Sequence, residues 1–255
     1  MPATERIDSF YFSGGNEDDR LAVVLIHGAG GNHLFWPSAI RRLAGYRIYA
    51  PDLPGHGRST GKGLQSVGAY VDSLLSWLEE VSIYRAVFVG HSMGAAIALK
   101  LAIELPEHVL GLGLIGASAR LRVSPELLES AANPTTFTNA IDKIMAWSYS
   151  PQAPPRLAEN ARAQMLKTRP SVLHGDFLAC HGFDETDNVA AIRCPTLVIC
   201  GEDDRMTPPR SAQSLANAIP SARLALIPAA GHMVMIEKPQ VVADLLAGFF
   251  QEIAR

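Results

Sequence analysis

Short apolar runs alternate with amphipathic runs along most of this chain, and this order restricts the fold more than any other feature. Leu21–His27 (LAVVLIH) is apolar up to its final residue, which is typical of a strand buried on both faces of a sheet. Between Leu64 and Leu78 the apolar side chains recur every three or four residues, which predicts a helix. Strands that alternate with helices predict a doubly wound, mostly parallel sheet of the α/β class. Further strands are expected at Tyr46–Pro51, Ala86–Val89, Val109–Ile115, Thr196–Cys200 and Arg223–Ile227, and further helices at Gly94–Glu104, 212–219 and 241–253.

The alternation breaks between residues 119 and 192. This stretch is typical of short helices separated by prolines, and it contains no good strand candidate. An insertion that starts at the carboxyl end of a strand lies where open α/β sheets bind ligands. We therefore expect a core domain built from residues 1–118 and 193–255, with residues 119–192 forming a helical cap that acts as a lid. The prolines in this stretch are Pro125, Pro134, Pro151, Pro154, Pro155 and Pro170.

The size and charge of the chain limit the classes of partner that it can bind. With 255 residues, 48% of them apolar and 18% charged, the chain can bury the core of one large α/β domain. Lys and Arg number 22 against 25 Asp and Glu, for a formal net charge of −3. Without a basic surplus to bind a phosphate backbone, no nucleic-acid partner is expected. We expect a monomer or a homodimer with a small-molecule substrate.

Three features bear on the location of the protein. Residues 1–15 lack the apolar stretch of a signal peptide, and no apolar run is long enough to span a membrane. The spacing of Cys180, Cys194 and Cys200 fits neither a CxxC pair nor a zinc ribbon, so free thiols in a reducing compartment are expected. A cytoplasmic protein is the resulting prediction.

The segment Gly90-His91-Ser92-Met93-Gly94 carries the strongest chemical signal. It follows the strand AVFV and precedes a helix, which is the setting that the G-x-S-x-G motif requires. The glycines two residues before and after the serine let strand and helix approach closely through a sharp turn. Such a turn exposes the Ser92 hydroxyl and directs the Met93 N–H, at a helix N-terminus, toward an anion that forms beside it.

A serine hydroxyl needs a base to take its proton, and His232 is the best placed of the eight histidines. It lies between the last strand and the last helix, in a loop at the same end of the sheet as Ser92. His91 is expected to point elsewhere on the tight turn, and His27 and His56 to make hydrogen bonds within glycine-rich loops. The remaining histidines are expected at the surface or in the cap, with His181 a candidate for the pocket lining: His33, His108, His174 and His181.

The base needs an acid to orient it, and three acids follow the strand TLVIC. Glu202, Asp203 and Asp204 all satisfy the order serine, acid, histidine. The reach of a loop that leaves the strand at Gly201 favours Asp204. Asp203 is the second candidate and otherwise part of a solvated turn, and Glu202 is the third.

The glycine-rich loop His27-Gly28-Ala29-Gly30-Gly31 ends the first buried strand. Its backbone N–H groups can face a developing oxyanion, and we select the N–H of Ala29 to act together with that of Met93. A phosphate-binding loop is the competing interpretation. It fails because neither G-x-x-x-x-G-K-[ST] nor G-x-G-x-x-G fits the residues present.

Taken together, these motifs resemble the α/β-hydrolase fold superfamily over nearly the full length of the chain. The resemblance implies a nucleophile at Ser92, an acid at Asp204, a base at His232 and an oxyanion hole formed by Ala29 and Met93. It also implies that the helical insertion is the family's cap domain. Members with an aspartate nucleophile, the epoxide hydrolases and dehalogenases, are excluded by Ser92. The matching segments are HGAGG at 27–31, PDLPGHGRS at 51–59, GHSMG at 90–94, GEDDRMTP at 201–208 and AGHMVMIEKP at 230–239.

The cap carries several methionine and aromatic side chains, which favour apolar acyl or alkyl groups. The function expected is therefore that of a carboxylesterase that cleaves esters of small to medium apolar acyl groups through an acyl-serine intermediate. A C–C bond hydrolase, lactonase or thioesterase could use the same residues, and a slowly reacting ligand-binding protein is a third hypothesis. No cationic cluster, metal site or cofactor is expected. The cap side chains are Phe137, Met145, Trp147, Met165, Leu166, Phe177, Leu178 and Phe183.

Overall fold

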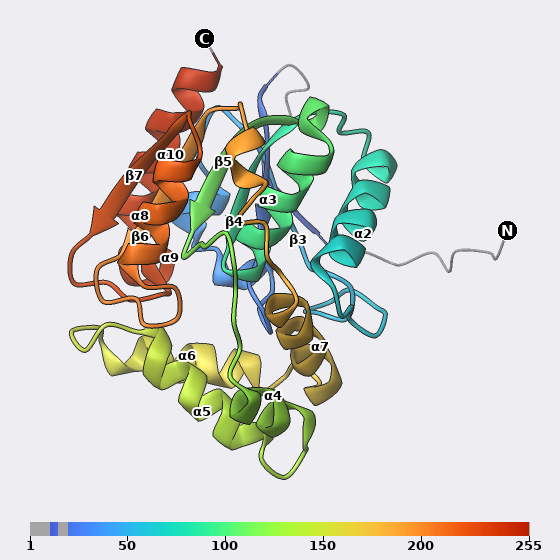
Figure 1. Cartoon of the computed structure of the whole chain (residues 1–255), viewed down its shortest axis with the longest axis vertical. Coiled ribbons are helices and arrows are strands. Elements are labelled where there is room, and N and C mark those ends of the chain that lie inside the picture. Colours follow the sequence, from blue (N-terminus) through green and yellow to red (C-terminus); the bar gives the residue numbers. More distant parts are fainter. Residues whose placement is uncertain (1–10, 15–19, 255) are drawn as a thin grey trace, which may run out of the picture.

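The computed structural model describes residues 11–14 and 20–254, which form a seven-stranded sheet flanked by helices (Figure 1). The strand order is β1-β3-β2-β4-β5-β6-β7, with β2 to β7 parallel and β1 antiparallel to β3. The doubly wound, mostly parallel α/β sheet predicted from the sequence is thereby confirmed. The strands are β1 (Tyr11–Gly14), β2 (Ala22–Ile26), β3 (Arg47–Pro51), β4 (Ala86–His91), β5 (Val109–Ile115), β6 (Thr196–Gly201) and β7 (Ala222–Ile227).

Two parallel strands of the sheet flank β2, and the chain reaches them in opposite directions. From β2 it passes to β3 on one side and then returns across the sheet to β4 on the other side. Ligands bind outside the carboxyl ends of the strands at such a change of direction in open α/β sheets. The glycine-rich loop at residues 27–31 follows β2 and Ser92 follows β4, so both lie at this point.

Alternate residues of β2 enter two separate cores on the two faces of the sheet. Val24 and Ile26 pack in the core with α2 (Val67–Glu80), α3 (Met93–Glu104) and α8 (Pro209–Ala218). Val23 and Leu25 pack in the core with α1 (Ser38–Arg41) and α10 (Pro239–Ile253). All four side chains are fully buried, which stabilises the fold by about 1.5–3 kcal/mol for each one. Burial on both faces explains the continuous apolar run of this strand.

Four helices lie between β5 and β6, and Figure 1 shows them together beyond the carboxyl ends of the strands. Pro125, Pro155 and Pro170 are each the first residue of one of them. Proline is well suited to that position, because the first N–H groups of a helix have no intrahelical acceptor. These prolines therefore start helices as well as separate them. The helices are α4 (Pro125–Ala132), α5 (Phe137–Ser148), α6 (Pro155–Met165) and α7 (Pro170–His181).

Strand β1 was not predicted from the sequence. Its four residues, YFSG, lack an apolar run, and the strand pairs only with β3 at the edge of the sheet. The helix expected from Leu64 begins at Val67, where the Ser66 hydroxyl accepts a hydrogen bond from the N–H of Ala69. Residues 1–10 and 15, part of the stretch in which no signal peptide is expected, lie outside the described residues.

Candidate active site

Ser92 lies in a strained turn between β4 and α3. Its φ of 53° and ψ of −114° are unusual for a residue with a side chain. A Cβ atom at Gly90 would lie 2.2 Å from the Gly94 carbonyl oxygen, and one at Gly94 would lie 2.1 Å from that of Ile26. Both separations are far shorter than a non-bonded contact between carbon and oxygen, so only glycine fits at positions 90 and 94. The crowding expected from the motif is therefore present.

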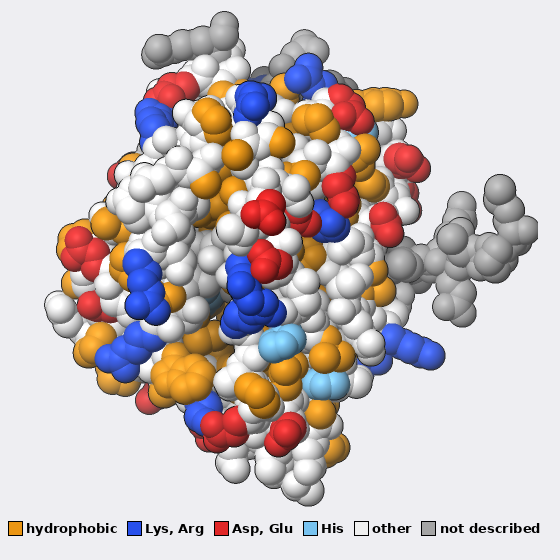
Figure 2. Space-filling model, in the orientation of Figure 1, with side chains coloured by type: hydrophobic (Ala, Val, Ile, Leu, Met, Phe, Trp, Pro, Cys, Tyr) orange, Lys and Arg blue, Asp and Glu red, His pale blue; other side chains and the backbone are white. Residues whose placement is uncertain are grey.

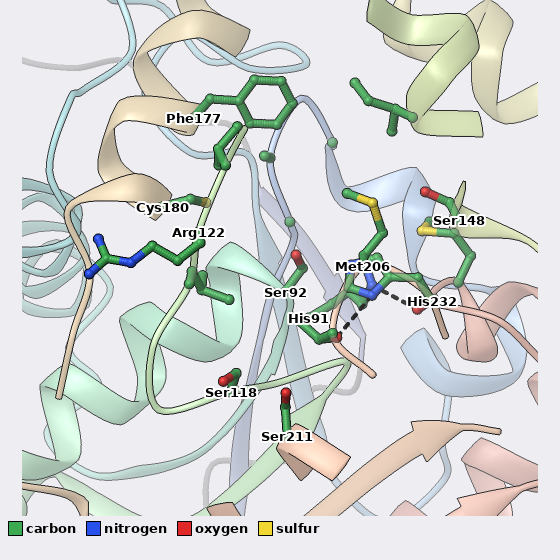
Figure 3. Close-up of a pocket in the computed structure, with 18 of the residues that line it drawn as sticks. His91, Ser92, Ser118, Arg122, Ser148, Phe177, Cys180, Met206, Ser211 and His232 are labelled. Atoms are coloured by element: carbon green, nitrogen blue, oxygen red, sulfur yellow. Dashed lines mark hydrogen bonds between the residues drawn. The ribbon is translucent and has the colours of Figure 1, made fainter. Parts of the chain in front are cut away.

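The Ser92 side chain faces a cavity that His232 also lines (Figure 3). Its backbone N–H donates to the Ile115 carbonyl at 2.9 Å, which fixes the turn against the end of β5. Within the described part of the chain, the Ser92 hydroxyl makes no hydrogen bond, and none joins it to His232. Hydrogen bonds between catalytic groups are often long before substrate binds. The structure therefore brings the predicted nucleophile and base to one cavity without bonding them to each other.

A buried carboxylate holds the imidazole of His232. His232 Nδ1 donates to Asp204 Oδ2 at 2.8 Å, which leaves Nε2 as the nitrogen that can accept a proton. Asp204 Oδ1 accepts from the backbone N–H groups of Met206 and Thr207, each at 2.8 Å. The Thr207 hydroxyl donates to Asp204 Oδ2 at 2.9 Å. Every acceptor position of this carboxylate is thus directed at a donor.

The same contacts control the charge of Asp204. Burial alone would raise its pKa, but the nearby His232 and the hydrogen bonds from His232 and Thr207 outweigh that effect and hold the pKa below its usual value. Asp204 is therefore a fixed anion that can orient His232 and stabilise its imidazolium form.

The other two acids of the loop lie away from His232. Asp203 is half-buried, and its Oδ2 accepts a hydrogen bond from the Ser150 hydroxyl at 2.6 Å. The sequence predicted that Asp203 is part of a solvated turn, and this was wrong. Asp203 instead binds the segment that follows α5. Glu202 is exposed. Of the three candidates, the structure places Asp204 at the imidazole.

Glu237 supports the loop that carries His232, a role that was not predicted from the sequence. It lies in α9 (Val234–Glu237), where its Oε1 accepts from the Gly231 N–H at 2.8 Å and its Oε2 from the Ser150 N–H at 2.9 Å. Burial raises the pKa of this carboxyl. The acid is visible in the segment AGHMVMIEKP, but one of its partners, Ser150, is 87 residues away in the sequence.

His91 lies against His232, and the prediction that it points elsewhere was wrong, since it lines the same cavity. The two ring centroids are 4.7 Å apart, and His91 Nε2 donates to the His232 carbonyl oxygen at 3.1 Å (Figure 3). Burial, followed by the nearby His232, lowers the pKa of His91 to about 3. A neutral His91 therefore supports the backbone of His232 without adding a charge beside it.

Ala29 lies in a tight turn directly after β2. The Gly31 N–H donates to the Gly28 carbonyl at 3.0 Å, and Gly30 has a φ of 64°, which favours glycine. Ala29 lines the cavity together with Ser92, and Met93 is the first residue of α3, where the N–H has no acceptor within the helix. The two N–H groups selected from the sequence thus belong to segments that border the cavity.

His27 stabilises the start of this loop, as expected. Its Nδ1 donates to the Gly28 carbonyl at 2.9 Å, and its Nε2 accepts from the Leu53 N–H at 3.0 Å. A second proton on the ring would have no acceptor. Burial, followed by the neighbouring His56, lowers the pKa of His27 to about 4. The ring is therefore neutral at ordinary pH.

The cavity beside Ser92 has a volume of about 370 Å³ and a mainly apolar lining. Three arginines, Arg120, Arg122 and Arg210, also line it, although no cationic cluster was expected. Figure 2 shows Lys and Arg side chains beside the hollow between the sheet and the inserted helices. The apolar lining side chains are Phe35, Leu121, Val123, Ile144, Met145, Met165, Phe177, Met206 and Met233.

Two of these arginines have acceptors outside the cavity. Arg120 forms an ion pair with Asp184 at 3.1 Å. The Arg122 guanidinium extends away from Ser92 in Figure 3 and donates to the His181 carbonyl at 3.2 Å. The cavity thus combines an apolar interior with cationic groups that are in part already paired.

Other histidines differ from their expected positions. His33 is buried rather than exposed, and its Nδ1 lies 2.9 Å from Asp52 Oδ1. His181 is not among the lining residues, because its Nδ1 bonds to the Val123 carbonyl at 3.0 Å. His56 forms its hydrogen bond with Asp176 of α7 as well as with its own loop. All three cysteines are free thiols.

Two negative findings apply to residues 11–14 and 20–254. No three His, Cys, Asp or Glu side chains lie together in a way that could hold a metal ion. No helix there has the length and apolar character needed to cross a bilayer.

Comparison with known proteins gives a family match over most of the chain. Residues 22–239 match the family described as alpha/beta hydrolase fold. The chain is 28% identical over 243 residues to protein ABHD8 of Bos taurus, covering 90% of this chain and 56% of that protein. The chain thus spans about half the length of this relative.

Two further relatives are of similar length to this chain. A 2-hydroxy-6-oxononadienedioate/2-hydroxy-6-oxononatrienedioate hydrolase of Pseudomonas sp. is 27% identical over 253 residues, covering 92% of this chain and 89% of that protein. A thermophilic esterase from Thermogutta terrifontis superposes with a TM-score of 0.88 and 26% identity, covering 97% of this chain and 94% of the other.

Proposed function

Because the chain belongs to the alpha/beta hydrolase family, we propose that it is a serine hydrolase that cleaves carboxylic esters of small to medium apolar acyl groups. One observation carries the proposal. A serine on a strained turn and a histidine bonded to a buried carboxylate open onto the same mainly apolar cavity. The esterase from Thermogutta terrifontis, with which the chain superposes, supports the choice of esters.

In the proposed reaction, Ser92 Oγ attacks the ester carbonyl while His232 Nε2 takes the hydroxyl proton. Asp204 holds the opposite ring nitrogen at 2.8 Å and stabilises the imidazolium that forms. The carbonyl oxygen becomes an oxyanion that accepts from the N–H groups of Ala29 and Met93. His232 then protonates the leaving alcohol. A water molecule, activated by the same histidine, releases the acid and restores Ser92.

The size of the cavity supports the substrate class. A volume of about 370 Å³ is at the low end of the range for small-molecule sites, roughly 300–1,000 Å³. Met145, Met165 and Phe177 from the inserted helices line it, so apolar groups lose water on entering it. In this proposal residues 119–192 form the cap and determine which acyl groups fit.

Hydrolysis of p-nitrophenyl butyrate by wild type and by Ser92→Ala tests the proposal. The variant should lose about 10⁴-fold or more in kcat, as deletions of a catalytic serine generally do. Near-wild-type turnover by Ser92→Ala would contradict the assignment. A turnover below about 1 s⁻¹ on every ester would instead favour a ligand-binding protein.

A second candidate is a hydrolase of an anionic carbonyl substrate, by C–C, lactone or thioester cleavage. The arginines of the cavity lining favour it, as does the similarity to the Pseudomonas hydrolase of a dioate. The ion pair of Arg120 with Asp184 and the direction of Arg122 away from Ser92 favour neutral esters instead. A series of p-nitrophenyl esters of increasing chain length, measured beside a thioester, a lactone and a monomethyl dicarboxylate, ranks these substrates by kcat/KM.

The cytoplasmic location and the monomeric or homodimeric state stay predictions from the sequence.

A further inference from the structure

Asp176 is a fully buried carboxylate on α7 that the proposed reaction does not use. Its Oδ2 accepts from the backbone N–H of Gly30 at 2.8 Å and lies 2.7 Å from His56 Nε2. Its Oδ1 accepts from the Tyr70 hydroxyl at 2.5 Å. These donors come from the loop after β2, the loop after β3 and helix α2. One side chain of the insertion therefore binds three separate segments of the core.

The contact with Gly30 is the informative one, because Gly30 follows Ala29 directly. Both polar backbone groups of Gly30 are bonded to the insertion, the N–H to Asp176 and the carbonyl to the Thr168 hydroxyl at 3.1 Å. A Cβ atom at Gly30 would lie 2.9 Å from Leu173 Cδ1 of α7. Asp176 thus orients the Ala29–Gly30 peptide, which directly follows the Ala29 N–H, and Thr168 orients the next peptide, Gly30–Gly31.

His56 balances the charge of Asp176. Both nitrogens of its ring face acceptors, Nδ1 the Pro54 carbonyl at 3.1 Å and Nε2 the Asp176 carboxylate. Satisfying both requires a proton on each nitrogen, which gives an imidazolium beside the carboxylate. Burial alone would lower the pKa of His56, but Asp176 outweighs it and the pKa is raised. The imidazolium of His56 and the carboxylate of Asp176 together carry no net charge, so the pair adds little repulsion to an oxyanion that forms beside the loop. An unpaired carboxylate would repel that oxyanion.

We propose that Asp176 is a positioning residue for the oxyanion hole, holding the Ala29 N–H in place through its hydrogen bond with the Gly30 N–H. The inference rests on the proposed ester hydrolysis. It also implies that α7 is a fixed part of the catalytic site and not a free lid, since moving α7 away from the core would break the hydrogen bonds of a buried ion pair.

The test compares Asp176→Asn with Tyr70→Phe, both normalised to active sites by titration with a phosphonate. Asparagine keeps the shape of the side chain, but it removes the negative charge that pairs with His56 and replaces one of the two acceptor oxygens by an NH₂ group, which weakens the hold on the Gly30 N–H. Tyr70→Phe removes a donor from the same carboxylate but leaves the contact with Gly30. We expect Asp176→Asn to lose about 10–100-fold in kcat on p-nitrophenyl butyrate, with KM changed less than about threefold. Tyr70→Phe should keep kcat within about threefold while its melting temperature falls.

A second readout separates positioning from general damage. A trifluoromethyl ketone forms a tetrahedral adduct that needs the oxyanion hole, whereas the matching amide binds without forming one. Asp176→Asn should weaken inhibition by the ketone in the same proportion as kcat/KM and leave inhibition by the amide unchanged. Wild-type kcat and ketone inhibition in Asp176→Asn would overturn the inference. An equal loss of kcat in Tyr70→Phe would also overturn it, because it would show a purely structural role.

A second variant covers the case in which Asp176→Asn does not fold. Asp176→Glu keeps the charge beside His56 but moves the carboxylate by one methylene relative to the Gly30 N–H, so the same loss of kcat is expected; wild-type kcat in this variant would contradict positioning. If wild type itself cleaves no ester and Ser92 is unreactive, the proposed function fails and not this inference alone. If wild type is active and Ser92→Ala is not, only the Asp176 variants decide the inference.

Discussion

The two sides of the proposed active site are supported in different ways. On the acid–base side, His232 is held by Asp204, whose carboxylate is in turn held by Thr207, and all three residues follow strands of the core. On the oxyanion side, the loop with Ala29 is held by Asp176 and Thr168, which belong to the insertion. The insertion reaches the acid–base side mainly through backbone groups near Ser150. In the proposed enzyme, the insertion would therefore do more than cover the cavity, because its side chains also hold one half of the proposed catalytic geometry.

The largest effect should come from the core side. Asp204→Asn keeps the shape of the acid, but its amide cannot hold His232 Nδ1 in the donating tautomer, so kcat should fall about 10⁴-fold. Asp203→Asn is the matched control. It keeps an oxygen that can accept from the Ser150 hydroxyl and loses only the negative charge, so kcat should stay within about fivefold. Steady-state hydrolysis of p-nitrophenyl butyrate measures both, and an equal or larger loss in Asp203→Asn would exchange the two assignments.

Two neutral histidines, one on each side, should make the protein sensitive to acid. The pKa of His27 is lowered to about 4 and that of His91 to about 3, in both cases first by burial. Below an unfolded value of about 6.5, the unfolded chain binds protons that the folded chain does not. Each histidine then lowers the free energy of unfolding by about 1.4 kcal/mol for each pH unit between about 6 and 4. His56 has a raised pKa, so it is protonated in both the folded and the unfolded state in this pH range. It therefore does not change how the free energy of unfolding depends on pH there.

Urea unfolding at pH 7, 6 and 5 measures this dependence. Because the pKa of Glu237 is raised, its carboxyl group binds a proton more readily in the folded state than in the unfolded state. This offsets part of the loss in the free energy of unfolding on acidification. His27→Gln and His91→Gln should each lower the number of protons bound on unfolding by about one, which makes the free energy of unfolding less dependent on pH. A free energy of unfolding that stays constant from pH 7 to pH 5 would contradict neutral burial of these rings.

The smallest effect should come from the second contact of Gly30. Thr168→Val removes the hydroxyl that donates to the Gly30 carbonyl but leaves the N–H bonded to Asp176. We expect a loss of about 1 kcal/mol in stability and less than about fivefold in kcat. Urea unfolding and ester hydrolysis measure the two quantities. A loss of kcat as large as that of Asp176→Asn would show that the carbonyl contact, and not the carboxylate, orients the loop.

The features that the sequence could predict are those that depend on residues close together in the chain. The elbow at Ser92 and the strands of the core follow from local patterns, because glycine crowding and two-faced burial leave a mark within a few residues. The choice of Asp204 over Asp203 followed from the reach of a short loop. Each of these features depends on neighbours in the sequence.

The supporting residues could not be found in that way. Asp176 bonds to Gly30 across 146 residues and to His56 across 120, and nothing near it in the sequence marks it as different from any other helical acid. Glu237 and Ser150 are similarly remote from each other. The edge strand β1 was missed because its four residues carry no apolar run and gain their order from pairing with β3. Contacts of this kind are set by the tertiary fold.

Labelling with a fluorophosphonate, followed by peptide mapping, tests the central assignment most directly. We predict one phosphonate per chain, bound to the oxygen of Ser92, with ester hydrolysis lost in proportion to the label and with no label in Ser92→Ala. A label on another residue, or continued ester hydrolysis by chains fully labelled at Ser92, would contradict it.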